Sequence, residues 1–166
     1  MKGCLLGLVA FLLLSPVAHA DTVALPLVAK YAGRDWVTVA HVTDGDTFKT
    51  TAGERVRLLA VDTPEVFFGT QCFGPEASAR ATELLTGQVV GLERDTSDTD
   101  RYGRLLRHVY LVDGLWVNGT LVAEGFARVT IYPPDRRHED LLRTLEAQAK
   151  ATGAGGWSAC GWSLDP

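Results

Sequence analysis

Residues 35–61 read D-W-V-T-V-A-H-V-T-D-G-D-T-F-K-T-T-A-G-E-R-V-R-L-L-A-V, and this stretch decides the fold. Apolar and β-branched residues gather in three short runs at 36–42, 47–50 and 55–61, a pattern typical of β-strands. Between the runs lie Asp44-Gly45 and Ala52-Gly53, two dipeptides that favour tight turns. We therefore predict a meander of three strands at the start of the folded domain.

The rest of the chain adds further strands and a few helices. Gly74-Pro75-Glu76 predicts a helix start, because proline and an acidic residue are both favoured in a first helical turn. Further patterns predict strands at 89–93 and 127–131, a hairpin joining 105–111 to 116–117, a short helix capped by Asn118, and a helix over 138–151. This order fits a small closed barrel better than alternating βαβ units. We predict an α+β, mainly β protein with a five-stranded Greek-key barrel of the OB type.

The N-terminal residues have the pattern of a secretory signal peptide. Lys2 precedes an apolar run at 5–14, and Ala18-His19-Ala20 provides a cleavage site. The alternative is a membrane anchor or a buried helix, but a bilayer span needs about 20 apolar residues. We expect a signal peptide over 1–20 cleaved near Ala20, a lead-in over 21–34, a main domain over 35–160 and a tail over 161–166. The expected product is exported to the periplasm or the medium, without stable membrane association.

Charge and cysteine content limit the partners and the compartment. The chain has 16 basic and 20 acidic side chains, and loss of Lys2 with the signal would leave a net charge of −5. Such a protein is a poor nonspecific partner for a polyanion, so any nucleic-acid site needs locally concentrated positive charge. Beyond the signal, Cys72 and Cys160 remain, and they form either one disulfide in an oxidising compartment or two free thiols.

Two acidic clusters are candidates for a cation site. Asp44 and Asp46 flank a tight turn, where carboxylate oxygens suit a hard cation, although the Asp-Gly dipeptide taken alone favours a plain hairpin turn. Arg57 lies on a strand that Pro64 interrupts, and Asp62 and Glu65 follow at this break. The alternative for this second cluster is an exposed, salt-bridged strand end.

A third cluster, Asp100-Arg101-Tyr102-Gly103-Arg104, provides a second arginine before a predicted strand. The alternative is a solvated charged turn, which the acidic residues Asp95, Asp98 and Asp100 favour at their own positions, so we assign this loop no metal. The three clusters together hold carboxylates for a cation, one carboxylate for a water and two guanidinium groups for a phosphate. Metal-assisted phosphodiester hydrolysis needs these groups, and the sequence has no G-x-S-x-G, P-loop, C-x-x-C or H-E-x-x-H motif for another chemistry.

Six motifs in order resemble the staphylococcal nuclease (thermonuclease) family over about residues 36 to 158. They are D-G-D-T at 44–47, R-L-L-A-V-D-T-P-E at 57–65, G-P-E-A at 74–77, D-R-Y-G-R at 100–104, V-N-G-T-L-V at 117–122 and H-E-D-L-L-R at 138–143. The resemblance implies an OB-fold barrel with about three helices, acting as a monomer. It also implies a Ca²⁺-dependent nuclease that acts on DNA and RNA and leaves 3′-phosphate products.

The resemblance assigns roles to named residues of this chain. Ca²⁺ would be bound by the carboxylates of Asp46 and Asp62 and the main-chain carbonyl of Thr63. Glu65 matches the carboxylate that orients or deprotonates the attacking water. Arg57 and Arg104 match the pair that binds the phosphate. The residues that match the nucleotide pocket are Arg101, Tyr102 and Tyr132.

Two departures and one alternative accompany the resemblance. A second pocket tyrosine corresponds to Thr130, and Phe67 and Phe68 replace a lysine-rich loop, where we expect them to pack on the barrel rather than stack on bases. The alternative function is a catalytically silent binding module. Such a module would have little reason to keep the charged residues that catalysis needs. All five are present here: Asp46, Arg57, Asp62, Glu65 and Arg104.

Overall fold

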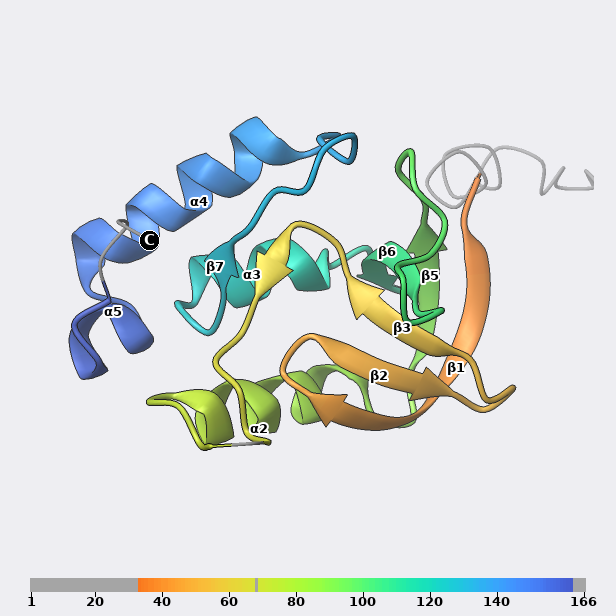
Figure 1. The fold of residues 1–166 in the computed structure, drawn as a ribbon, viewed down its shortest axis with the longest axis horizontal. Coiled ribbons are helices and arrows are strands. Elements are labelled where there is room, and N and C mark those ends of the chain that lie inside the picture. The colour runs from red at the N-terminus through yellow and green to blue at the C-terminus, as the bar shows by residue number, and fades with distance from the viewer. Residues whose placement is uncertain (1–32, 68, 163–166) are drawn as a thin grey trace, which may run out of the picture. The chain divides into compact units, whose positions relative to one another are not determined.

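A computed structural model describes residues 33–67 and 69–162, which contain one closed barrel of five strands. The strands are β1 (Asp35–Asp44), β2 (Thr47–Thr50), β3 (Arg55–Leu58), β5 (Val89–Glu93) and β6 (Leu105–Leu111), and they pair in the order β1-β2-β3-β6-β5 (Figure 1). The predicted fold class is confirmed. The signal peptide, the lead-in up to residue 32 and the end of the tail lie outside the described residues.

The long strand β1 closes the barrel because it pairs with two partners. Its first half, from Asp35 to Thr38, is antiparallel to β5, and its second half, from Val39 to Asp44, is antiparallel to β2. Register shifts within the second half bend the strand between these partners. A parallel pairing of β3 with β6 completes the circle.

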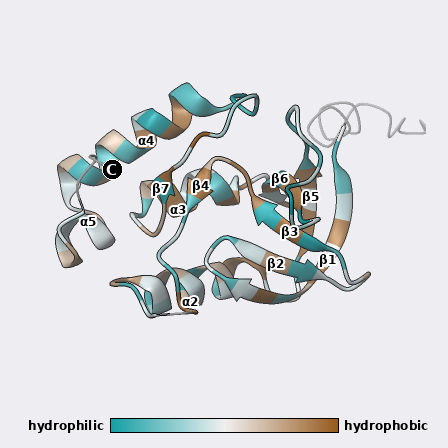
Figure 2. Cartoon of the chain, in the orientation of Figure 1, coloured by the Kyte–Doolittle hydropathy of each residue, from teal (hydrophilic) through white to brown (hydrophobic). Residues whose placement is uncertain are grey.

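The described part of the chain has four helices, where about three were expected. They are α2 (Gly74–Leu85), α3 (Val117–Ala123), α4 (Glu139–Thr152) and the short α5 (Gly156–Ala159). Figure 1 shows α2 beside β1, and α3 packs against both β6 and α4. Apolar and polar residues alternate along α4 in Figure 2, because one face of the helix is buried and the other meets solvent. No helix in residues 33–67 or 69–162 has the length and apolarity needed to cross a membrane.

The predicted strand over 55–61 is wrong at its end. Strand β3 stops at Leu58, and Ala60 takes a left-handed conformation with φ of 62°, which turns the chain. Val61 and Asp62 then form β4 (Val61–Asp62), which pairs with β7 (Arg128–Val129) in a separate two-stranded sheet (Figure 2). This turn directs Asp62 away from the barrel ladder.

The sequence predicted that Asn118 caps α3, and this prediction is wrong. The helix begins one residue earlier, with Trp116 at the cap position, and Asn118 is fully buried in its first turn. The Asn118 side chain accepts a hydrogen bond from the Val109 N–H at 2.9 Å and donates one to the Leu59 carbonyl at 2.9 Å. Asn118 therefore ties the helix to β6 and to the segment that follows β3.

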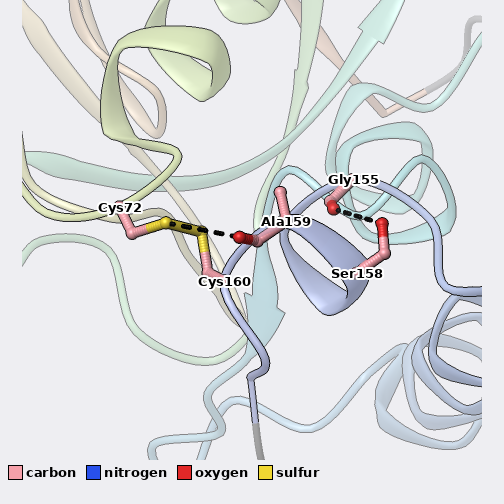
Figure 3. The surroundings of a disulfide bond; sticks show 5 residues. All are labelled: Cys72, Gly155, Ser158, Ala159 and Cys160. Carbon is pink, nitrogen blue, oxygen red and sulfur yellow. Dashed lines mark hydrogen bonds between the residues drawn. A yellow bond between two sulfur atoms is a disulfide. The ribbon is translucent and has the colours of Figure 1, made fainter.

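Cys72 and Cys160 form a disulfide whose Cα atoms lie 5.9 Å apart (Figure 3). The bond links the segment before α2 to the residue that ends α5, across a sequence separation of 88. It therefore joins the connection between β4 and α2 to the C-terminal end of the described chain.

Candidate functional site

The turn between β1 and β2 is shaped to fit against Thr63. Asp46 donates its main-chain N–H to the Asp44 carboxylate at 3.2 Å, which fixes the turn. A Cβ at Gly45 would lie 2.6 Å from the Thr63 hydroxyl oxygen, so glycine is needed for this close approach. The turn is therefore more than a hairpin connection, because it holds Asp46 against the end of β4.

Arg57 joins the two carboxylates that the sequence predicted as cation ligands. Its Nε lies 3.0 Å from Asp46 Oδ1, and its Nη2 lies 3.0 Å from Asp62 Oδ1. Its Nη1 donates to the carbonyls of Leu58 and Val61 at 2.9 and 2.7 Å. The left-handed turn that ends β3 provides these two carbonyls, so the local backbone holds the guanidinium between the carboxylates.

Thr63 is the third predicted cation ligand, and it lies against Asp46. Its main-chain N–H and its hydroxyl donate to Asp46 Oδ2 at 3.0 and 3.2 Å. On the other oxygen, Asp46 Oδ1 accepts a hydrogen bond from the Thr47 hydroxyl at 3.1 Å. Arg57 and Thr63, which are separate from Asp46 in sequence, therefore meet with the neighbouring Thr47 around one buried carboxylate.

Negative charge exceeds positive charge at this point. Burial, followed by the charge of Asp46, raises the pKa of Asp44 to about 6. Burial also raises the pKa of Asp62, where the charge of Asp46 adds to the effect and Arg57 and Arg128 oppose it. Arg57 pairs with Asp46 and Asp62, and Asp44 adds a third carboxylate beside Asp46, so this group of acids favours an additional cation.

The donor set fits a hard cation in an open site. Within residues 33–67 and 69–162, no three His, Cys, Asp or Glu side chains are grouped as a metal centre. The predicted ligands are instead two carboxylates and one main-chain carbonyl, and an all-oxygen set of this kind suits Ca²⁺. The raised pKa of Asp44 fits this assignment, because a bound cation would relieve the repulsion between Asp44 and Asp46.

Arg104 reaches the same site from the loop before β6. Its Nε lies 2.7 Å from Asp100 Oδ2, and its main-chain N–H donates to Asp100 Oδ1 at 3.0 Å. Its Nη1 donates to the Thr47 hydroxyl at 3.3 Å, and that hydroxyl contacts Asp46. Two hydrogen bonds thus connect Arg104 to the carboxylate that Arg57 contacts.

Asp100 is a functional residue that the sequence reading assigned only to a charged loop. Burial raises its pKa, but hydrogen bonds from the Arg104 main chain and side chain outweigh this and lower the pKa overall. The ionised carboxylate therefore holds Arg104 in place at neutral pH. The available signal was the spacing of four residues between an acid and an arginine.

A cavity of about 460 Å³ lies beside this group. Both Arg57 and Arg104 line it, together with the residues predicted for a nucleotide pocket, Arg101, Tyr102 and Tyr132, and with Thr130. Tyr132 and Tyr102 are 73% and 56% exposed, and the Arg101 guanidinium lies 4.8 Å from the centre of the Tyr102 ring. The cavity thus has cationic groups and exposed aromatic rings at its edge.

Glu65 lies nearby in sequence, but its carboxylate does not contact Arg57 or Arg104. Glu65 is exposed. Among the described residues, no group donates a hydrogen bond to the Glu65 carboxylate or forms an ion pair with it. Its main chain is fixed by Gln71: the Glu65 N–H donates to Gln71 Oε1 at 3.0 Å, and the Gln71 N–H donates to the Glu65 carbonyl at 2.9 Å. The Glu65 carboxylate is therefore exposed to solvent, and Glu65 is not among the residues that line the cavity.

Phe67, two residues after Glu65, is not packed as expected. Phe67 is 51% exposed, so the expectation that it packs on the barrel is wrong. Phe68 lies outside the described residues.

Comparison with known proteins places this site in a family. The family model described as staphylococcal nuclease homologue matches residues 55–159. The chain is 40% identical over 137 residues to the SPbeta prophage-derived endonuclease YokF of Bacillus subtilis strain 168, covering 78% of this chain and 46% of that protein. Endonuclease YncB of the same strain is 41% identical over 134 residues, covering 76% and 63%. Thermonuclease of Staphylococcus intermedius is 40% identical over 118 residues, covering 68% and 70%.

The two Bacillus relatives are longer than the region they share with this chain, which spans 46% and 63% of their lengths. The family match covers three of the five barrel strands (β3, β5 and β6), the arginine pair and α4, and it ends at the last residue of α5. The chain belongs to the staphylococcal nuclease family.

Proposed function

We propose that this protein is a Ca²⁺-dependent nuclease that hydrolyses phosphodiester bonds of DNA and RNA and leaves 3′-phosphate ends. One observation supports this above all: Arg57 and Arg104, from separate parts of the chain, line one cavity next to the Asp46 carboxylate. Relatives named endonuclease and thermonuclease point to the same reaction.

The cation would be held by Asp46, Asp62 and the main-chain carbonyl of Thr63. The excess of carboxylates around Arg57 supports this assignment. When bound, Ca²⁺ supplies Lewis-acid polarisation of a phosphate oxygen.

The two arginines would bind the scissile phosphate and neutralise the charge that grows on its oxygens. Asp100 and Thr47 hold Arg104, and two carbonyls and two carboxylates hold Arg57. Such fixed donors need little reorganisation as the reaction proceeds, which is the source of electrostatic catalysis.

Glu65 would orient the attacking water and accept its proton. Its exposed carboxylate and fixed main chain support this role, because a general base must be accessible yet held in position. Glu65→Gln is expected to lower kcat by orders of magnitude, with the fold unchanged.

The pocket residues would hold the nucleotide next to the scissile bond. Tyr102 and Tyr132 offer aromatic faces, and Arg101 lies against the Tyr102 ring. Thr130 gives a smaller contact than a tyrosine would, and stacking of a base on an aromatic ring is worth about 1–3 kcal/mol.

The protein would act as a monomer outside the cytosol, in the periplasm or the medium. The disulfide between Cys72 and Cys160 supports this location, since such bonds persist mainly in oxidising compartments. The signal-like pattern of residues 1–20 supports it independently.

The test is cleavage of end-labelled single-stranded and double-stranded DNA and RNA, in Ca²⁺ or in excess EDTA, with the product ends identified by mass spectrometry. We expect 3′-phosphate ends in Ca²⁺ and no cleavage in EDTA. Full activity in EDTA contradicts the role of calcium, and binding without cleavage in Ca²⁺ would instead favour the catalytically silent module.

A further inference from the structure

We propose that the Cys72–Cys160 disulfide positions Glu65, and that reduction of this bond lowers turnover while leaving substrate binding intact. The proposal rests on the proposed nuclease function, since it concerns how that site is held. It makes the enzyme dependent on the redox state of its surroundings.

The main chain of Glu65 is held by the segment that contains Cys72. Gln71, the neighbour of Cys72, bonds to both main-chain polar groups of Glu65, at 3.0 and 2.9 Å. Gly74 lies against the Glu65 carbonyl so closely that a Cβ there would be 2.6 Å from its oxygen, and the Gly74 N–H donates to the Gln71 carbonyl at 3.0 Å. A shift of residues 71–74 would therefore shift Glu65.

The disulfide links this segment to a well-anchored part of the chain (Figure 3). Cys160 ends α5, whose first residue, Gly156, donates its N–H to the Gly125 carbonyl at 3.0 Å. The Phe73 ring stacks on the Phe126 ring with centroids 5.3 Å apart and lies edge-on to the Trp162 ring at 6.2 Å, and the Phe73 carbonyl accepts a hydrogen bond from the Ala77 N–H in α2 at 3.0 Å. The disulfide is the covalent link between this segment and α5. Loss of the bond would leave residues 71–74 held by the start of α2 and by the ring contacts of Phe73, without the covalent link to α5.

The phosphate-binding side of the site is held by other contacts. The hydrogen bonds and ion pairs of Arg57 run to Asp46, Leu58, Val61 and Asp62. Those of Arg104 run to Asp100 and Thr47. Because residues 71–74 take part in none of these, we expect reduction to affect the water-activating carboxylate and not phosphate binding.

The redox step is a thiol–disulfide exchange with a dithiol reductant. A thiolate attacks the sulfur of Cys72, which is exposed, to form a mixed disulfide and release the Cys160 thiolate. The second thiol of the reductant then displaces Cys72. In total, two electrons and two protons pass to the protein, which gains two thiols, and the reductant becomes a disulfide.

The experiment compares oxidised and dithiothreitol-reduced protein in a Cys4→Ser background, so that Cys72 and Cys160 are the sole cysteines. Steady-state cleavage of a labelled oligonucleotide in Ca²⁺ is measured at a temperature where far-ultraviolet circular dichroism shows both forms folded. We expect kcat to fall about tenfold or more on reduction, since misplacement by about 1 Å has effects of this size. KM should stay within about twofold, and reoxidation should restore kcat.

A double-mutant cycle separates positioning from a general loss of structure. The fold-loss of kcat caused by Glu65→Gln should shrink when Cys72→Ser and Cys160→Ser are also present, because the carboxylate is then already misplaced. The fold-loss caused by Arg104→Ala should be the same with and without the disulfide. Equal losses for Glu65→Gln in both backgrounds would overturn the proposal.

A second variant serves if the reduced protein does not stay folded. Gln71→Ala keeps the disulfide and changes an exposed side chain, and it removes the bond to the Glu65 N–H. We expect a lower kcat with unchanged KM, and an unchanged kcat would refute the link from Cys72 to Glu65. An oxidised protein with no activity at all would instead refute the proposed nuclease function.

Discussion

Arg57→Gln removes the one guanidinium that lies between the two predicted calcium carboxylates. The Arg57 side chain is 14% exposed and that of its partner Asp46 is 9% exposed, so this ion pair is nearly dry. Removing one partner of a buried pair costs about 3–5 kcal/mol of unfolding free energy. The Asp62 side chain is 43% exposed and remains hydrated, so loss of its pair with Arg57 changes the unfolding free energy little. Asp46 also keeps its hydrogen bonds from Thr63. We therefore expect a loss of about 3 kcal/mol in EDTA, at the lower end of that range.

Calcium should restore more stability to this variant than it adds to the native protein. Without Arg57, the ligand carboxylates are uncompensated, so a cation binds more tightly, and a tenfold gain in affinity adds about 1.4 kcal/mol at saturation. The assay is urea unfolding followed by tryptophan fluorescence, in EDTA and in saturating Ca²⁺.

Arg80→Gln is the matched control for this experiment. Arg80 makes a two-point contact with Glu124 at 2.7 and 2.9 Å, and these residues are not among the predicted calcium ligands. Its removal should lower stability by an amount that calcium does not change. Equal calcium increments in native protein and Arg57→Gln would refute the reasoning, because Asp46 and Asp62 would then not bind the cation beside Arg57.

Three further changes test other parts of the site. Asp44→Asn should raise the unfolding free energy in EDTA by about 1 kcal/mol at pH 8, a value discounted for partial exposure. The pKa of Asp44 is raised to about 6 in the folded protein, so ionised Asp44 lowers the unfolding free energy of the native protein as the pH rises from about 4 to 6. At about pH 4 Asp44 is protonated in the folded protein, so urea titration should show no stability gain from Asp44→Asn. Asp100→Asn should lower kcat by about tenfold in oligonucleotide cleavage, because Arg104 loses its charged partner; an unchanged kcat would mean that Asp100 does not hold Arg104 for the reaction. Joint replacement of Cys72 and Cys160 by serine should lower the unfolding free energy by about 4.5 kcal/mol for a sequence separation of 88, and a loss below about 1 kcal/mol in urea would contradict a stabilising bridge.

The sequence allowed the barrel strands and the turns between them to be predicted from local patterns, whereas the roles of the charged residues were implied by the resemblance to the nuclease family. Alternating strands and Asp-Gly turns are readable over a few residues, and the Asp-Gly turn at residue 44 also places Asp46. The strand break at Pro64 indicated where Asp62 and Glu65 would be presented. In each case, neighbouring residues alone restrict the backbone.

The parts that could not be predicted depend on partners far along the chain. Val61 looks like the continuation of β3, and its pairing with Val129 instead becomes visible only in three dimensions. Asn118 has a strong preference for helix caps, but its buried bonds to β6 outweigh that preference. Gln71 has no motif at all, because its role depends on the loop that brings its amide to the Glu65 main chain.

The central claim is that one cation and one phosphate meet these charged residues at a single place. Its most direct test is a crystal structure of the protein with Ca²⁺ and a 3′-phosphorylated oligonucleotide product. We expect one Ca²⁺ bound by Asp46, Asp62 and the Thr63 carbonyl, with Arg57 and Arg104 both contacting the terminal phosphate. A calcium ion bound by other residues, or a phosphate that contacts only one of the two arginines, would contradict the account.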